Sequence, residues 1–289
     1  MIAYIQQEFP RHRLFGIRFD VLNMRQAVDW VLQSVAVGRR SATRYVVTPN
    51  VSLTLLHQRS AEFREFIHNA DLTIVDGMPL VKASRWFGKP LPERVAGSDL
   101  VVQLFAAAVP EMPLRVFLLG AASGVADRAA ERIHQQWEGV RVVGTCSPNF
   151  GFEHDAKQNR AILDTVNAAA PDVLIVGLGA PKQEAWTFHH RHQIQAPVTL
   201  CVGGTIDFLA GEQIRAPEWV RSAGVEWMWR LGTNPRRLLK RYLFDALNLP
   251  RLFLDEFRDQ CPIWCGGRTT ETMIEKRTDI SNCVKEQRR

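Results

Sequence analysis

Asp76 is an ionisable residue placed where a short apolar run of the sequence ends. The run covers residues 72–75, and Gly77 and Pro79 after the aspartate mark a turn. A run of this length and composition is typical of a buried strand, so a carboxylate stands at a strand exit. Such a carboxylate can accept a proton, orient a hydroxyl group of a ligand, or tie down its own turn.

Four further polar turns follow apolar runs: TPN at residues 48–50, GAASG at 120–124, GAPKQE at 179–184 and GGTIDF at 203–208. Glycines let backbone N–H groups approach a phosphate at a helix start, although a plain tight turn explains GAASG equally well. GAPKQE is more specific, because Lys182 and Gln183 add polar groups that a structural turn does not need. We expect these two side chains to contact a ligand. The structural alternatives are a solvated lysine and a glutamine that caps a helix.

The elements that would position these turns alternate between apolar runs and amphipathic segments. The predicted strands are RYVV, LTIV, LRVFLL, VRVV, VLIV and VTLC. This alternation predicts an α/β fold: a Rossmann-like, mostly parallel sheet with helices on both faces. The carboxyl ends of parallel strands share one edge, so Asp76 should face the same crevice as the other polar turns.

Apolar residues at helical spacing predict two helices near these turns. Residues 52–70 have apolar side chains at helical spacing and are predicted to form a helix. Residues 97–109 are predicted to form another helix, with Ser98 or Asp99 as its N-cap.

The C-terminal part of the chain is basic and rich in tryptophan. Residues 213–241 include seven basic and two acidic residues. Their net charge of +5 is most of the +6 of the whole chain. Cationic side chains beside an apolar, Trp-rich stripe suit a helix pair lying on an anionic lipid surface. The alternative is a helical hairpin that packs on the sheet with solvated arginines. This change in composition divides the chain into an expected Rossmann-like domain (1–212), a basic, Trp-rich helical appendage that is the candidate for membrane docking (213–260) and a polar tail expected to be flexible (261–289).

Composition sets broad limits on function. The 289 residues are 46% apolar, which is enough for a sizeable core, and the five cysteines favour a reducing compartment over a disulfide framework. No apolar window of about 18 residues predicts a membrane span. The HHRH stretch at residues 189–192 lacks a carboxylate at metal-site spacing, and no DxD-like pair follows a strand. We therefore expect no bound metal.

Seven motifs, in this order, resemble the WecG/TagA/CpsF glycosyltransferases, glycosyltransferase family 26. They are TPN, ADLTIVDGMPL, RVAGSDL, VFLLGAASGVA, PDVLIVGLGAPKQEAW, GGTIDFLAG and RAPEWVRSAGVEWMWRL, and the resemblance covers residues 14–255. It implies an inverting, metal-independent enzyme that moves a sugar from a UDP-sugar to a polyprenyl-diphosphate-linked sugar. The implied setting is bacterial cell-surface polysaccharide assembly, including a branch of xanthan-type exopolysaccharide glucosyltransferases.

The resemblance also implies roles for single residues. Asp76 matches the aspartate proposed as the catalytic base of the family, and Asp207 would suit recognition of ribose or uracil. Three C-terminal arginines are candidates for binding the diphosphate. Together with the polar turns, the expected substrate-binding residues are Thr48, Asn50, Arg94, Gly120, Gly179, Lys182, Gln183, Asp207, Arg215, Arg221 and Arg230.

The expected partners are the UDP-sugar, the lipid-linked acceptor and an anionic membrane surface. The protein would bind peripherally at the cytoplasmic face of the inner membrane, with no cofactor, because the UDP-sugar is a substrate, and with no nucleic acid. The sequence does not determine the donor sugar, the acceptor sugar, the linkage, the pathway or whether the protein forms a homo-oligomer. Two alternatives remain: a soluble nucleotide-dependent Rossmann enzyme, for which no convincing dinucleotide fingerprint exists, and a non-catalytic lipid-binding module.

Overall fold

The computed structural model describes residues 8–39, 41–213, 217, 220, 226–233 and 235–260. For residues 226, 227, 230, 233, 235–238 and 260 it describes the backbone but not the side chain. Contacts within the chain define two compact units, Met1–Leu249 and Pro250–Arg289. The predicted boundaries after residues 212 and 260 stay predictions.

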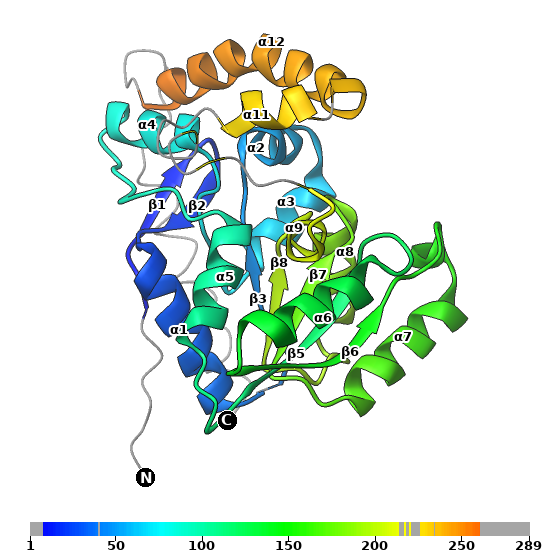
Figure 1. Cartoon of the computed structure of the whole chain (residues 1–289). Coiled ribbons are helices and arrows are strands. Elements are labelled where there is room, and N and C mark those ends of the chain that lie inside the picture. The colour runs from blue at the N-terminus through cyan, green and yellow to red at the C-terminus, as the bar shows by residue number, and fades with distance from the viewer. Residues whose placement is uncertain are drawn as a thin grey trace, which may run out of the picture. The chain divides into compact units, whose positions relative to one another are not determined.

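A six-stranded sheet forms the centre of the first unit (Figure 1). Its strand order is β4-β3-β8-β7-β5-β6, and all neighbouring strands are parallel. The strands are β3 (Arg44–Val47), β4 (Leu72–Thr73), β5 (Leu114–Gly120), β6 (Val140–Cys146), β7 (Val173–Gly177) and β8 (Val198–Cys201). The predicted α/β fold with a parallel sheet is therefore confirmed.

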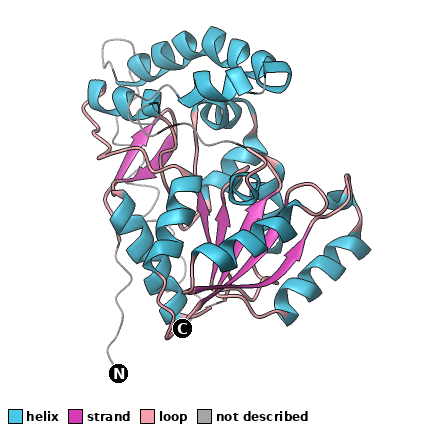
Figure 2. Ribbon diagram, viewed as in Figure 1, coloured by secondary structure: helices cyan, strands magenta, loops and turns pink. Residues whose placement is uncertain are grey.

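Helices cover both faces of this sheet (Figure 2). Alternate residues of each strand point to opposite faces, so each face packs against its own layer of helices. Val116, Leu118 and Ile175 pack on one side in a core that includes residues of α1, α5, α6 and α9. Phe117 and Val176 pack on the other side against α7 and α8. The helices are α1 (Met24–Val37), α2 (Val51–Arg59), α3 (Ala61–His68), α4 (Met78–Trp86), α5 (Gly97–Ala107), α6 (Val125–Gln136), η1 (Phe152–His154), α7 (Ala156–Ala168), α8 (Lys182–His190), α9 (Thr205–Ala210), α11 (Glu226–Thr233) and α12 (Pro235–Gln260).

An antiparallel hairpin precedes the sheet, and it supports the strand that leads to Asp76. It consists of β1 (Arg11–Leu14) and β2 (Ile17–Asp20). The carboxylate of Asp20 accepts a hydrogen bond from Arg11 at 2.7 Å and another from the backbone N–H of Thr73 in β4 at 2.8 Å. The hairpin was not predicted from the sequence.

Two local helix predictions were wrong in detail. Residues 52–70 form two helices, because Ser60 ends α2 and its hydroxyl group accepts a hydrogen bond from the N–H of Phe63 to start α3. Helix α5 begins at Gly97 after an N-cap at Ala96 that makes no side-chain capping bond, so neither Ser98 nor Asp99 is the cap.

Candidate active site

The loop that carries Asp76 lies against the TPN turn after β3. The N–H of Asp76 donates to the carbonyl of Pro49 at 3.0 Å, and the N–H of Ile74 donates to Val47 at 3.0 Å. Residues 72–75 are buried, whereas the side chain of Asp76 is 24% exposed. The chain thus delivers this carboxylate to the carboxyl edge of the sheet, beside the residues that follow β3.

The TPN turn that Asp76 contacts contains Thr48 and Asn50. Thr48 is buried, and Asn50 caps α2, because its side-chain oxygen accepts a hydrogen bond from the N–H of Leu53 at 3.2 Å. The carbonyl of Asn50 accepts two further bonds from Thr54. The carboxamide oxygen thus already accepts one bond from the helix, and the NH₂ group of Asn50 can also contact a ligand.

Arg94 joins Asp76 to a second carboxylate. One guanidinium nitrogen lies 3.6 Å from Oδ1 of Asp76, and another donates to Oδ2 of Asp99 at 2.8 Å. All three side chains are at least three-quarters buried. Arg94 thus holds both carboxylates in place through its two ion pairs. Asp99 was misassigned as a helix cap because its pairing with Arg94 depends on the path of the loop between them.

Gly120 lies at the end of β5 with φ of +124°, and the chain passes very close to a neighbouring strand. A Cβ atom at this position would lie 2.5 Å from the carbonyl of Gly177 in β7. This close approach alone requires glycine at position 120. Gly124, at the other end of the turn, starts α6 in a left-handed conformation and makes no side-chain capping bond. The turn thus presents the start of α6, a favourable environment for negative charge, at the sheet edge.

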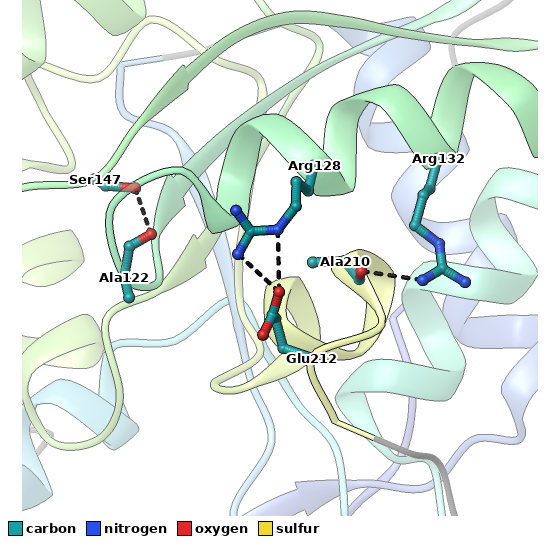
Figure 3. Close-up of polar contacts among 6 residues, drawn as sticks. All are labelled: Ala122, Arg128, Arg132, Ser147, Ala210 and Glu212. Carbon is teal, nitrogen blue, oxygen red and sulfur yellow. Dashed lines mark hydrogen bonds and ion pairs between the residues drawn. The ribbon is translucent and has the colours of Figure 1, made fainter.

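Two arginines of α6 bind the end of α9 and the segment that follows it, as Figure 3 shows. Arg128 donates to one carboxylate oxygen of Glu212 through two nitrogens, at 3.0 and 2.7 Å. Arg132 donates to the carbonyl of Ala210 at 3.0 Å, and nearby the hydroxyl group of Ser147 donates to Ala122 in the GAASG turn at 3.2 Å. Sequence reasoning missed Arg128, because its partner lies 84 positions away.

Lys182 contacts the segment after β6. Its ammonium group lies 2.6 Å from a carboxylate oxygen of Glu153 and within 5.1 Å of the centre of the Phe150 ring. The hydrogen bond from Lys182 holds the pKa of Glu153 below its ordinary value. The lysine is therefore ion-paired rather than a simply solvated cation.

Gln183 is buried and connects two neighbouring elements. Its side-chain oxygen accepts a hydrogen bond from the N–H of Gly203 at 3.0 Å, and its NH₂ group donates to Glu184 at 2.8 Å. Glu184 is fully buried, and its second oxygen has no hydrogen-bond partner among the described residues. Gln183 thus holds the GGTIDF turn and does not cap α8, whose N-cap is Pro181. Sequence reasoning did not single out Glu184.

The remaining predicted residues lie around this edge or outside the described residues. Gly179 precedes α8 with φ of +79°, and its carbonyl accepts a hydrogen bond from the N–H of Gln183. Asp207 lies in the first turn of α9 and accepts a hydrogen bond from the side chain of Gln213 at 3.1 Å. Arg215, Arg221 and the side chain of Arg230 lie outside the described residues, so their predicted roles are untested.

The first half of α12 packs along α2, the helix that Asn50 caps. Arg241 donates to the hydroxyl group of Ser52 at 2.7 Å, and that hydroxyl group donates to Asp245. Arg59 of α2 donates to Asn248 at 2.7 Å. The C-terminal helix therefore borders the element that starts at the candidate site.

The described residues contain neither a metal-binding cluster nor a helix that could cross a membrane. No group of three or more His, Cys, Asp or Glu side chains is arranged there to hold a metal ion. None of the helices in the described ranges has the length and apolar character needed to span a bilayer.

Comparison with known proteins gives a consistent result. Residues 12–261 match the sequence profile described as "Glycosyl transferase WecG/TagA/CpsF family". The chain is 33% identical over 193 residues to an N-acetylglucosaminyldiphosphoundecaprenol N-acetyl-beta-D-mannosaminyltransferase of Bacillus spizizenii, covering 67% of this chain and 72% of that protein. A protein of the same name from Staphylococcus aureus (strain NCTC 8325) is 28% identical over 229 residues, 78% of this chain and 85% of its own length. The chain therefore belongs to the WecG/TagA/CpsF family of glycosyltransferases.

Proposed function

We propose that this protein transfers a sugar from a UDP-sugar to a sugar linked to polyprenyl diphosphate, in the assembly of a bacterial cell-surface polysaccharide. The observation that carries the proposal is the placement of Asp76 and Arg94 at the carboxyl edge of the sheet in a chain of this family. The names of the relatives support the lipid-linked class of acceptor.

In the proposed reaction Asp76 is the general base. It takes the proton of an acceptor hydroxyl group as that oxygen attacks the anomeric carbon of the donor. The bond from the anomeric carbon to the UDP oxygen breaks on the opposite face, so the configuration inverts and UDP leaves with the electron pair. Arg94 keeps the carboxylate of Asp76 in place through their ion pair.

The departing UDP carries negative charge that the protein has to stabilise. Two helices, α6 and α8, begin at this edge without side-chain capping bonds. The backbone N–H groups of a first helical turn bind phosphate oxygens well, and the helix dipole adds to this attraction. We propose that these groups, with arginine side chains, stabilise the diphosphate without a metal ion.

A donor panel tests the proposal. UDP-N-acetylmannosamine, its uronic acid and UDP-glucose are each mixed with a short-chain prenyl-diphosphate N-acetylglucosamine acceptor, and released UDP is measured. We expect one donor to be preferred by at least about tenfold, because a single hydroxyl contact in such a pocket discriminates strongly. The rate should be unchanged by a chelator, and NMR should show an inverted anomeric centre. UDP release that does not depend on the acceptor, or no release with any donor, would overturn the proposal.

We further propose that the protein binds peripherally to the cytoplasmic face of the inner membrane, partly through α12. This helix exposes Leu239, Leu243 and Leu247, at helical spacing, beside the exposed cations Lys240 and Arg241. Apolar side chains flanked by cations suit the boundary between lipid head groups and acyl chains.

Exchanging two of these leucines tests the role of α12. The double variant Leu243→Ser/Leu247→Ser should bind vesicles that contain phosphatidylglycerol roughly tenfold more weakly, because it loses two apolar side chains from the lipid contact. Turnover of the short-chain acceptor should stay at the wild-type level. Met112→Ser is the matched control, because Met112 is 79% exposed but precedes β5 at the opposite edge of the sheet. Equal vesicle binding by the double variant and the wild type would refute the assignment.

A further inference from the structure

Trp86 is a large, mostly exposed apolar side chain at the end of α4, the helix that begins two residues after Asp76. Its relative exposure is 80%, and it is the only tryptophan classed as exposed among those whose side chains the structure describes. Its ring stacks on that of Phe87, with 6.3 Å between the ring centres. Phe87 in turn meets the edge of Phe15, a buried residue of the N-terminal hairpin. The exposed indole therefore stands on a fixed aromatic base.

The helix that carries Trp86 is firmly built on its other side. In α4, Leu80, Val81 and Ser84 are buried. The hydroxyl group of Ser84 donates to Val81 and accepts from the N–H of Leu91, which ties the loop after the helix back onto α4. The exposure of Trp86 is thus not explained by a poorly packed helix.

The charged residues that neighbour Trp86 in the sequence are all basic. Lys82 and Arg85 are exposed on α4, and Lys89 follows the helix. Between Asp76 and Glu93 the sequence contains these three basic residues and no acidic residue. Lys82, Arg85 and Trp86 are three and four positions apart, so they share one face of the helix. An indole surrounded by cations is complementary to an anionic lipid surface, where the ring enters the head-group layer and the cations pair with lipid phosphates.

We propose that the end of α4, with Lys82, Arg85, Trp86 and Lys89, is an anchor for anionic lipid that is separate from the C-terminal helices. The inference rests on the proposed function, because a lipid-linked acceptor gives the anchor its purpose. Helix α4 starts two residues after Asp76, and its nine residues span about 13 Å. An indole in the head-group layer would therefore hold the catalytic carboxylate at a short, fixed distance from the acceptor's diphosphate.

Vesicle binding tests the anchor. Trp86→Ala should weaken binding to phosphatidylglycerol vesicles roughly tenfold, with little binding of either protein to pure phosphatidylcholine. Lys82→Glu/Arg85→Glu should weaken it at least as much in low salt, and high salt should reduce this difference. Wild-type fluorescence should be quenched by brominated lipids, and Trp86→Phe should lose part of that quenching. Met112→Ala, an exposed residue at the opposite sheet edge, should bind like the wild type.

Turnover separates this inference from the proposed function. Trp86→Ala should turn over a short-chain acceptor in solution at the wild-type rate, and it should have a roughly tenfold higher KM for acceptor embedded in vesicles. A wild type inactive on every acceptor would refute the proposed function, while vesicle binding would still test the anchor. Vesicle binding by Trp86→Ala within twofold of the wild type, or unchanged quenching in Trp86→Phe, would overturn the anchor. Either result would leave the exposed face to a protein partner or to solvent.

Discussion

Replacing Asp76 with asparagine is expected to lower kcat about 10²- to 10⁴-fold, the usual contribution of a general base. Asparagine has the same shape as aspartate but cannot take a proton from the acceptor hydroxyl group. The backbone bond from residue 76 to Pro49 does not involve the side chain, so the loop should keep its path. The dissociation constant for UDP should change less than about threefold, because the proposed diphosphate contacts come from helix starts and arginines.

Released UDP gives kcat for the variant, and isothermal titration with UDP gives the dissociation constant. Asp99→Asn is the matched control, because Asp99 also pairs with Arg94 but on the other side of its guanidinium group. It should lower kcat much less, since it removes a partner of Arg94 and not the proton acceptor. A variant Asp76→Asn that keeps more than a tenth of the wild-type kcat would show that this carboxylate only orients the substrate or its own turn.

The location of Asp76 could be predicted from the sequence, because an apolar run before it predicts a strand and Gly77 and Pro79 after it predict a turn. A buried strand in a parallel sheet is an uninterrupted apolar run, and residues 72–75 show one before the aspartate. Only Leu72 and Thr73 pair with β3 as strand residues. The backbone N–H groups of Ile74 and Asp76 still donate to Val47 and Pro49, so the chain stays alongside β3 and the turn that follows it. The gathering of polar turns at one edge then follows from parallel topology alone.

Short and polar elements were harder to predict. The hairpin strands RHRL and IRFD have four residues each and contain many charges, and they are too short for alternation to separate them from a loop. Gly16 was the one local signal for the turn, because Phe15 and Gly16 both adopt positive φ and only the glycine favours that conformation. The break between α2 and α3 also had a local signal in Ser60, but the continuous apolar spacing on both sides outweighed it.

Long-range pairs decide what the polar side chains of the site can do, and these pairs are not visible in the sequence. Lys182 meets Glu153, and Arg128 meets Glu212, only because the fold brings together segments far apart in the chain. The same applies to Gln183, whose bond to Gly203 depends on the adjacency of β7 and β8. Residue type at a strand exit can therefore suggest a ligand contact, but tertiary structure decides whether the side chain is already engaged.

Glu184 should make the stability of the protein depend on pH in a direction opposite to that of a salt-bridged carboxylate. Burial raises the pKa of Glu184 from 4.5 to about 7, and the hydrogen bond from Gln183 opposes only part of this effect. Between these two pH values the folded protein retains a proton that the unfolded chain has lost. The free energy of unfolding therefore falls as the pH rises through this window, by about 3 kcal/mol in total.

The variant Glu184→Gln removes this dependence, because its side chain is neutral throughout while its oxygen can still accept the bond from Gln183. Urea unfolding at pH 4.5 and pH 8 should show the variant gaining about 3 kcal/mol relative to the wild type at the higher pH. Glu131→Gln, at an exposed position of α6, is the control and should show no such change. A constant difference between wild type and Glu184→Gln at both pH values would mean that Glu184 is solvated or charge-paired in the folded protein. Its link through Gln183 to the N–H of Gly203 would then no longer be a buried, neutral support of the GGTIDF turn.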